Sequence, residues 1–184
     1  MLRRGLAIVC GTAAALAAGP LTALAGLSAS TADLTFGQLA YSHVQLVNTG
    51  TLTLTATDTG TAGLGVTNAG WNVTLLASDF AYSGPYNGKP IPAANLVIVS
   101  AHPPTPVSGQ PISPTGGPRT TGASGALNVA RKTLQADGPS GILMLTYYGI
   151  GTYRQAIDLS LKVPGQAAAG TYTSTLVVTM TAGP

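Results

Sequence analysis

The chain has 184 residues, of which 45% are apolar, 7% are charged and 5% are aromatic, and it contains no glutamate. Soluble domains carry about 25% charged residues, so a helical surface of paired lysines and glutamates is excluded. Disorder is not indicated either, because it requires low hydrophobicity together with high net charge. Threonine, serine, glycine and amide groups supply the polarity, which is typical of a secreted all-β protein of one domain, or at most two.

The formal net charge of +3 at pH 7 depends on the N-terminus, because Arg3 and Arg4 precede an uncharged stretch that reaches Asp33. Beyond that stretch, six basic residues face five acidic ones. No run of lysine or arginine could follow a phosphate backbone. Nucleic acid is therefore not an expected partner.

Residues 1–25 have the parts of an export signal. Arg3-Arg4 forms the basic region, residues 5–18 form an apolar region, and Ala23-Leu24-Ala25 is a small-residue cleavage site. We expect cleavage after Ala25 and a secreted product. The alternative is an uncleaved anchor helix, and only in that case do we expect a contact with a membrane.

Cys10 is the single cysteine of the chain and lies inside the predicted signal peptide. The mature domain, residues 26–184, would then have no thiol for a disulfide, a metal site or a nucleophile. No cofactor or metal is expected, and the domain must be stable by burial alone.

Apolar and polar side chains alternate along four segments, which is the period of half-buried β-strands. Two shorter apolar runs predict strands that are covered on both faces, and one more strand is expected near Leu34 to Phe36. The alternating segments are Thr51 to Thr57, Trp71 to Ser78, Tyr153 to Val163 and Tyr172 to Met180, and the apolar runs are Leu96 to Val99 and Ile142 to Leu145.

Two connections have clear signals: Asn87-Gly88 predicts a tight turn, and Pro164 to Gly170 predicts a loop. Ala126 to Ala136 stays open between a helix, a strand and a loop. Sequential strands with polar turns predict an antiparallel β-sandwich or a flattened barrel.

Residues 102–125 contain six prolines among serine, threonine and glycine, with almost no large apolar side chain. Such a segment buries too little to order itself, so we expect a long Pro-rich loop. Long loops in compact domains are functional or tolerated insertions. We favour a surface insertion over a projecting binding loop.

The mature chain offers few groups for catalysis. His43 has no nearby acid in sequence, and His102 opens the Pro-rich loop, so we interpret both as satisfied or exposed side chains. Asp58 and Asp79 follow strand-like runs, where Asp side chains commonly accept local hydrogen bonds, and Asp158 alternates to the wet face of a strand. No nucleotide-binding, metalloprotease or calcium-binding motif occurs, and we predict no catalytic residue and no enzyme. The carboxylates are Asp33, Asp58, Asp79, Asp137 and Asp158.

Aromatic side chains gather near chain reversals, where a sugar ring could stack on them. The competing interpretation is that each tyrosine fills an edge of the sandwich with its hydroxyl in water. Trp71 belongs to an apolar strand face and is expected in the core. The candidate binding residues are Tyr82, Tyr86, Tyr147, Tyr148 and Tyr153.

Two segments resemble the motifs of the WxL domain, a bacterial surface family. Thr-rich residues 52–60, followed by Gly70-Trp71-Asn72-Val73, are similar to its proximal motif. The distal motif is similar in spacing to Tyr172 through Pro184, with Val178 in place of the second tryptophan and Met180 in place of the following leucine. The motif residues that we expect in the core are Trp71, Val73, Tyr172, Leu176, Val178 and Met180.

The resemblance implies an exported, non-catalytic protein that is held non-covalently on the cell wall through peptidoglycan or another wall glycan, often beside other surface proteins. No Leu-Pro-x-Thr-Gly sorting signal occurs, so we expect the folded domain to provide retention. Thr-rich strands with few charges leave a second possibility, a structural subunit that assembles by strand addition. A weaker alternative is a polysaccharide-active enzyme that uses two of the aspartates.

Overall fold

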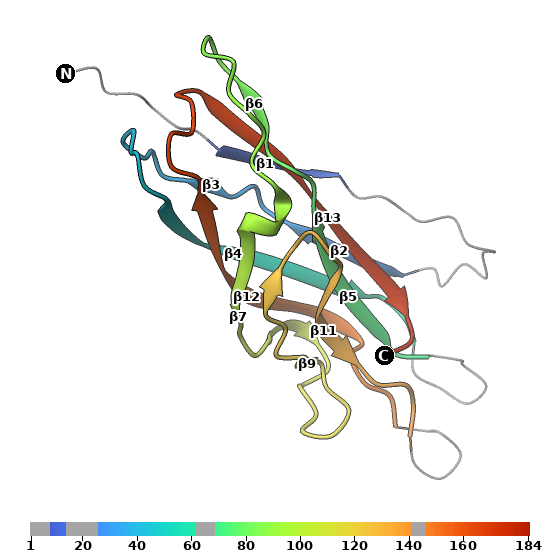
Figure 1. The fold of residues 1–184 in the computed structure, drawn as a ribbon. Helices are drawn as coiled ribbons and strands as arrows, with labels where there is room; N and C mark the ends of the chain where they lie inside the picture. The colour runs from blue at the N-terminus through green and yellow to red at the C-terminus, as the bar shows by residue number, and fades with distance from the viewer. Residues whose placement is uncertain (1–7, 14–25, 62–68, 141–145) are drawn as a thin grey trace.

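The computed structural model describes residues 8–13, 26–61, 69–140 and 146–184. Two sheets pack against each other in an elongated β-sandwich (Figure 1), which confirms the predicted all-β fold. Sheet A has the strand order β3-β1-β13-β5-β11-β9, with β6 beside β13. Sheet B has the order β10-β7-β12-β4-β2, with β8 beside β12.

The strands of sheet A are β1 (Ile8–Ala13), β3 (Thr35–Phe36), β5 (Trp71–Ala77), β6 (Ala81–Ser83), β9 (Arg119–Thr120), β11 (Arg131–Ala136) and β13 (Thr171–Ala182). The strands of sheet B are β2 (Leu27–Thr31), β4 (Leu46–Asp58), β7 (Leu96–Ala101), β8 (Thr105–Gly109), β10 (Gly125–Ala126) and β12 (Gly151–Val163). A short 3₁₀ turn, η1 (Ala93–Asn95), precedes β7.

The longest ladder joins β12 to β4 without interruption, from Gly151 opposite Asp58 to Val163 opposite Leu46. The alternation predicted from the sequence is confirmed, because Leu52, Leu54 and Ala56 are buried between exposed or half-buried threonines. Each large apolar side chain buried this way contributes about 1.5–3 kcal/mol. This ladder fixes the spine of sheet B.

In sheet A, β13 is antiparallel to β5, so that Val178 lies opposite Leu75 and Met180 lies opposite Val73. Trp71 begins β5 and is completely buried. The two segments that resemble WxL motifs are therefore neighbouring strands of one sheet, and their inward residues share the core with those of sheet B.

The sequence did not decide the secondary structure of residues 126–136. The last six of these residues form strand β11. A register shift between Lys132 and Leu134 leaves Thr133 and Leu134 both buried. Such a bulge breaks the period of two. That break explains why the spacing of apolar residues in this segment could also suggest a helix.

The Pro-rich segment is not a loop throughout, contrary to the expectation. β8 pairs with β12 and β9 pairs with β11, although every residue of β8 is exposed. Arg119 binds Asp137 through both carboxylate oxygens, at 2.6 and 2.8 Å, and Gln110 accepts a hydrogen bond from the Tyr153 hydroxyl at 2.9 Å. Main-chain pairing and these polar contacts order the segment without large apolar side chains.

Three further expectations concern the turn at Asn87-Gly88, the loop of residues 164–170 and the apolar run Ile142 to Leu145. Asn87 adopts a left-handed φ of 49°, whereas Gly88 does not, so the reversal is not a two-residue type I′ turn. Residues 164–170 form the predicted loop, and Ile142 to Leu145 falls outside the described residues. Along the described residues no helix has the length and apolar character needed to cross a bilayer.

Candidate functional site

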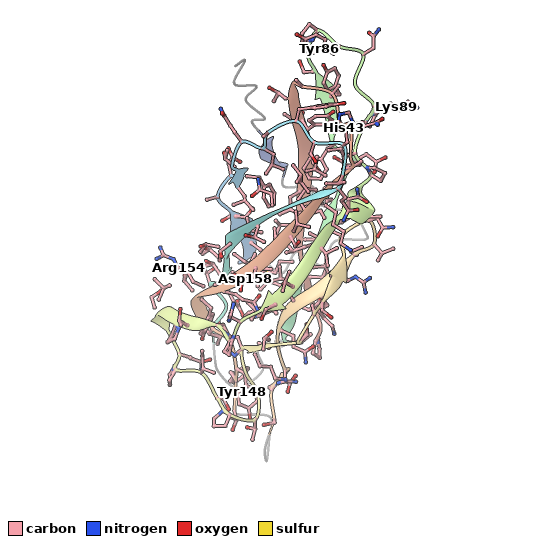
Figure 2. All side chains as sticks on the ribbon, turned by 60° about the vertical axis from the view of Figure 1, so that its left-hand side comes forward. His43, Tyr86, Lys89, Tyr148, Arg154 and Asp158 are labelled. Atoms are coloured by element: carbon pink, nitrogen blue, oxygen red, sulfur yellow. The ribbon has the colours of Figure 1, made fainter. Side chains whose placement is uncertain are left out.

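The five candidate tyrosines fall into two groups at opposite ends of the sandwich. Tyr86 lies beside Lys89 and His43 at one end, and Tyr148 lies at the other (Figure 2). The 13 residues of β12 connect the two ends and span about 40 Å at the usual rise of a strand. The tyrosines therefore cannot form one aromatic patch.

The end that carries Tyr147, Tyr148 and Tyr153 offers little aromatic surface. Tyr147 is 8% exposed and Tyr153 is fully buried. Tyr148 donates to or accepts from Ser140 Oγ at 2.6 Å, and its ring is covered by Gly116, where an added Cβ would lie 2.2 Å from the ring. Tyr147 and Tyr153 are thus buried, and Tyr148 is half-buried with Gly116 packed against its ring, which leaves little aromatic surface for a ligand at this end.

Tyr82, at the opposite end, holds its surroundings together. Its hydroxyl donates to the Ala169 carbonyl at 2.9 Å and accepts from the Tyr86 main-chain N–H at 3.0 Å. Its ring lies 5.2 Å from the ring of Tyr172, and Gly88 packs so closely that a Cβ there would lie 2.5 Å from it. We interpret Tyr82 as a structural link between two loops, because its hydroxyl bonds to both of them and its ring packs against Tyr172 and Gly88.

The loop of residues 164–170 joins the parts of this end. Gln166 has a left-handed φ of 65°, and its main-chain N–H donates to the Ser42 carbonyl at 2.7 Å. The hydroxyl of Tyr172 donates to Ala168 at 3.1 Å. Hydrogen bonds thus hold the loop on both of its sides, and one hollow lies on each side of the loop.

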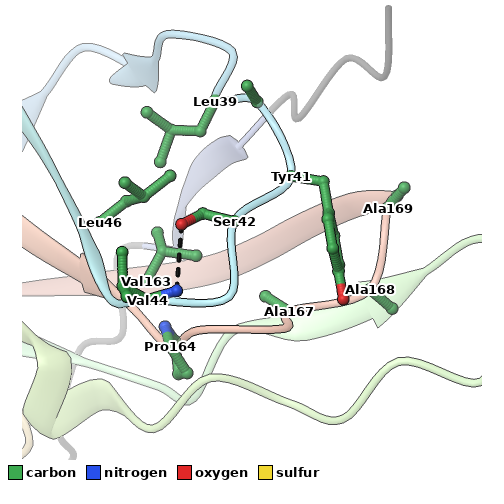
Figure 3. A pocket seen from close by; sticks show the side chains of 12 residues that line it. Leu39, Tyr41, Ser42, Val44, Leu46, Val163, Pro164, Ala167, Ala168 and Ala169 are labelled. Carbon is green, nitrogen blue, oxygen red and sulfur yellow. Dashed lines mark hydrogen bonds between the residues drawn. The ribbon is translucent and has the colours of Figure 1, made fainter. Parts of the chain in front are cut away.

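The first hollow is an apolar groove between residues 39–46 and the loop (Figure 3). Tyr41 stands on one side of it, with its ring edge-on to His43 at 5.2 Å, and Leu46 lies on the other side. The groove leaves only about 40 Å³ for water-sized molecules. It is too narrow for a sugar ring or a small-molecule ligand of ordinary size.

The second hollow is a larger cleft between residues 86–91 and the same loop, with about 500 Å³ of open room. That volume lies within the range of about 300–1,000 Å³ typical of small-molecule sites. Its polar groups are the side chains of Asn87, Lys89 and Gln166, and Tyr86 is 52% exposed at its rim. We call it the loop cleft, and its walls are completed by Gly88, Pro90, Ile91, Pro164, Gly165, Ala167, Ala168 and Tyr172.

The loop cleft has the chemistry of a binding site. None of its lining residues is an acid, a histidine, a serine or a threonine, so its walls hold neither a carboxylate pair nor a serine–histidine pair. Lys89 gives the cleft a single positive charge. Burial and the nearby Tyr82 raise the pKa of Tyr172, which keeps its hydroxyl a neutral donor.

Two of the aspartates proposed for a catalytic pair, Asp58 and Asp158, are widely separated. Asp58 lies opposite Gly151, whereas Asp158 lies seven residues further along the same partner strand, about 23 Å away. Asp79 accepts a hydrogen bond from the Ala93 N–H at 2.7 Å after β5. Glycoside hydrolysis needs two carboxyl groups within about 5–9.5 Å, which Asp58 and Asp158 cannot provide.

The sequence did not indicate a group of three hydrogen-bonded polar side chains on the outer face of sheet B. His102 Nε2 lies 2.7 Å from Asp158 Oδ2, and the Thr51 hydroxyl donates to Asp158 Oδ1 at 2.8 Å. These hydrogen bonds lower the pKa of Asp158. Asp158 is 56 positions from His102 and 107 positions from Thr51 in the sequence. Only the register of the strands could have shown that these residues meet. Across the described residues no group of three or more potential ligands could hold a metal ion.

The residues that carry the WxL resemblance lie mostly inside the protein. Trp71, Val73 and Tyr172 are fully buried, Leu176 and Val178 are 3% and 6% exposed, and Met180 is partly buried against the same core. Comparisons with protein-family models, with curated proteins and with solved structures find no match to this chain.

Proposed function

We propose that the protein is an exported, non-catalytic domain that associates non-covalently with the bacterial cell wall by binding peptidoglycan or another wall glycan. The observation that carries the proposal is the loop cleft. It combines a half-exposed tyrosine, two amide side chains and one lysine in a hollow of the right size, with no carboxylate or histidine among its walls.

Each polar group of the cleft has a counterpart in a wall glycan. The ring of Tyr86 could stack on a sugar, and the amides of Asn87 and Gln166 could exchange hydrogen bonds with hydroxyl and acetamido groups. Peptidoglycan also carries carboxylates, which the ammonium group of Lys89 would attract. Beyond the first 25 residues the chain has six basic and five acidic residues, so a general attraction to a charged polymer is not required.

The resemblance to the WxL domain supports the same function. Its second tryptophan is replaced by Val178, which is 6% exposed and faces the core. The replacement therefore alters packing inside sheet A and does not remove an aromatic side chain from the surface. Wall binding at the loop cleft does not depend on that tryptophan.

The test is cosedimentation of the purified mature protein with washed cell-wall sacculi across a salt series. We expect saturable binding with only a small salt dependence, because Lys89 is the single charged residue that lines the cleft. Tyr86→Ala and Asn87→Ala should each weaken binding by about tenfold, since stacking or a hydrogen bond contributes about 1–1.5 kcal/mol. Thermal unfolding of each variant would verify that the fold is retained.

Tyr41→Ala is the matched control, because Tyr41 is similarly exposed but lines the narrow groove on the other side of the loop. It should bind sacculi like the wild type. Loss of binding in Tyr41→Ala with no effect of Tyr86→Ala would move the site away from the cleft. Release of soluble sugar fragments during the incubation would contradict a non-catalytic role.

A further inference from the structure

Strand β1 occupies an unusual position in sheet A. It lies between β13 and β3, and it runs parallel to β13 in six consecutive pairs, from Ile8 opposite Tyr172 to Ala13 opposite Val177. Among the described residues every other ladder is antiparallel. Figure 1 shows β1 alongside the long β13.

The same six residues belong to the segment that we expect to be removed on export. Cleavage after Ala25 would take a strand out of the interior of sheet A, while β2, the next strand along the chain, stays on β4 in sheet B. The Tyr172–Val177 stretch of β13 and the short β3 would lose their shared neighbour. Export would thus open a site with the dimensions of one strand.

The opened side of β13 lacks the features that protect natural sheet edges. Edge strands are usually short, or are guarded by charged residues, proline or bulges. Residues 171–182 contain no charge and no proline, and no register shift interrupts the pairing of β13 with β5. Beneath the site, Tyr172, Leu176 and Phe36 are 0, 3 and 1% exposed with β1 in place. β13 is built as an interior strand.

Among the residues that the structure describes, the mature chain has no spare strand for this site. Every described strand of five or more residues other than β1 is already paired with a partner that cleavage would leave in place. A described strand of a second copy could fill the site only by breaking one of its own ladders. The segment that fits, Ile8-Val-Cys-Gly-Thr-Ala13, is uncharged and free of proline. A donated strand should share that chemistry.

We propose that the space between β13 and β3 is a strand-acceptor site, which the leader fills before export and an uncharged extended segment of a different protein fills afterwards, parallel to β13. Main-chain hydrogen bonds would supply affinity. The side chains of Tyr172 and Leu176 beside the site would select the side chains at alternate positions of the donated strand. The proposal is independent of glycan binding, because the strand-acceptor site and the loop cleft are formed by different residues and share only Tyr172.

The test uses the exported protein after intact-mass analysis has shown that its N-terminus is Gly26. The probe is a labelled synthetic peptide of residues 6–15 in which Cys10 is replaced by serine to prevent oxidation. We expect saturable binding by fluorescence anisotropy and a higher unfolding temperature of the complex. A control peptide with Val9→Pro and Gly11→Pro lacks two main-chain donors and should bind at least about tenfold more weakly.

Two further arms complete the design. The uncleaved chain of residues 1–184 should not bind the peptide, because its own β1 occupies the site, and Tyr86→Ala in the mature protein should bind it normally. The proposal fails if the mature protein ignores the peptide, or if intact mass shows that the leader is retained. It also fails in its choice of partner if light scattering shows oligomers of the mature protein that the peptide dissociates, since the donor would then be a second copy.

Discussion

The indole Nε1 of Trp71 donates a hydrogen bond of 3.1 Å to the main-chain carbonyl of Gly149, which lies 78 residues further along the chain. Trp71 begins β5 in sheet A, and Gly149 precedes β12 in sheet B. The indole also packs 6.3 Å from the ring of Tyr153. The Trp71 side chain thus packs in the core and links sheet A to sheet B at the start of β5 and β12.

Trp71→Ala should lower the free energy of unfolding by about 3–5 kcal/mol, because it removes a fully buried aromatic side chain. Trp71→Phe keeps part of the packing but leaves the Gly149 carbonyl without its donor, at a cost of about 1–3 kcal/mol. Urea unfolding would measure both. Leu76→Ala on the same strand is the control, since Leu76 is 37% exposed. A small effect of Trp71→Ala would contradict the core position.

Gly149→Ala should also destabilise the fold, for two separable reasons. The residue has a φ of +77°, and an added Cβ would lie 2.8 Å from the indole nitrogen and 2.5 Å from Ala136 Cβ. Gly122→Ala isolates the first reason, because Gly122 has a φ of +68° and nothing within 4 Å of an added Cβ. We expect Gly149→Ala to cost at least about 1 kcal/mol more than Gly122→Ala. Equal losses would show that the indole moves aside without cost.

These contacts illustrate what the sequence could and could not predict. Alternation of apolar and threonine residues predicted the strands, because a strand with one buried face requires that period. The same pattern placed Trp71 in the core. It could not show that Gly149 receives the indole, because that contact depends on how two sheets are superposed.

The candidate site was the harder part to predict for the same reason. The loop cleft joins residues 86–91 to residues 164–168, and no local pattern indicates that these segments meet. The position of tyrosines near turns singled out Tyr86, which lines the loop cleft. The signal could not separate Tyr86 from Tyr147 or Tyr153, because a tyrosine beside a chain reversal is equally suited to a buried edge.

Gln155 is a buried amide that the strand pattern alone did not single out. It is fully buried on β12, and its Nε2 donates to the His102 carbonyl at 2.9 Å and to the Thr133 carbonyl at 3.0 Å. Gln155→Met retains most of the volume but removes both donors, so it should lower the free energy of unfolding by about 1–3 kcal/mol. Arg154→Ala, one residue away and exposed, should change it by less than about 0.5 kcal/mol. A neutral Gln155→Met would mean that the two carbonyls find other donors.

The pH dependence of stability should report on Asp158. Hydrogen bonds from His102 and Thr51 lower its pKa below the ordinary value of 3.8. Because folding favours the ionised carboxylate, this contribution to stability is complete above the ordinary value and is lost as the pH falls through the lower folded value. The difference in unfolding free energy between wild type and Asp158→Asn should therefore shrink as the pH is lowered from about 6 to about 2. Thr51→Ala should leave part of that pH dependence, since the contact with His102 remains. Parallel stability curves for wild type and Asp158→Asn over this range would show that the carboxylate titrates alike in the folded and unfolded chains.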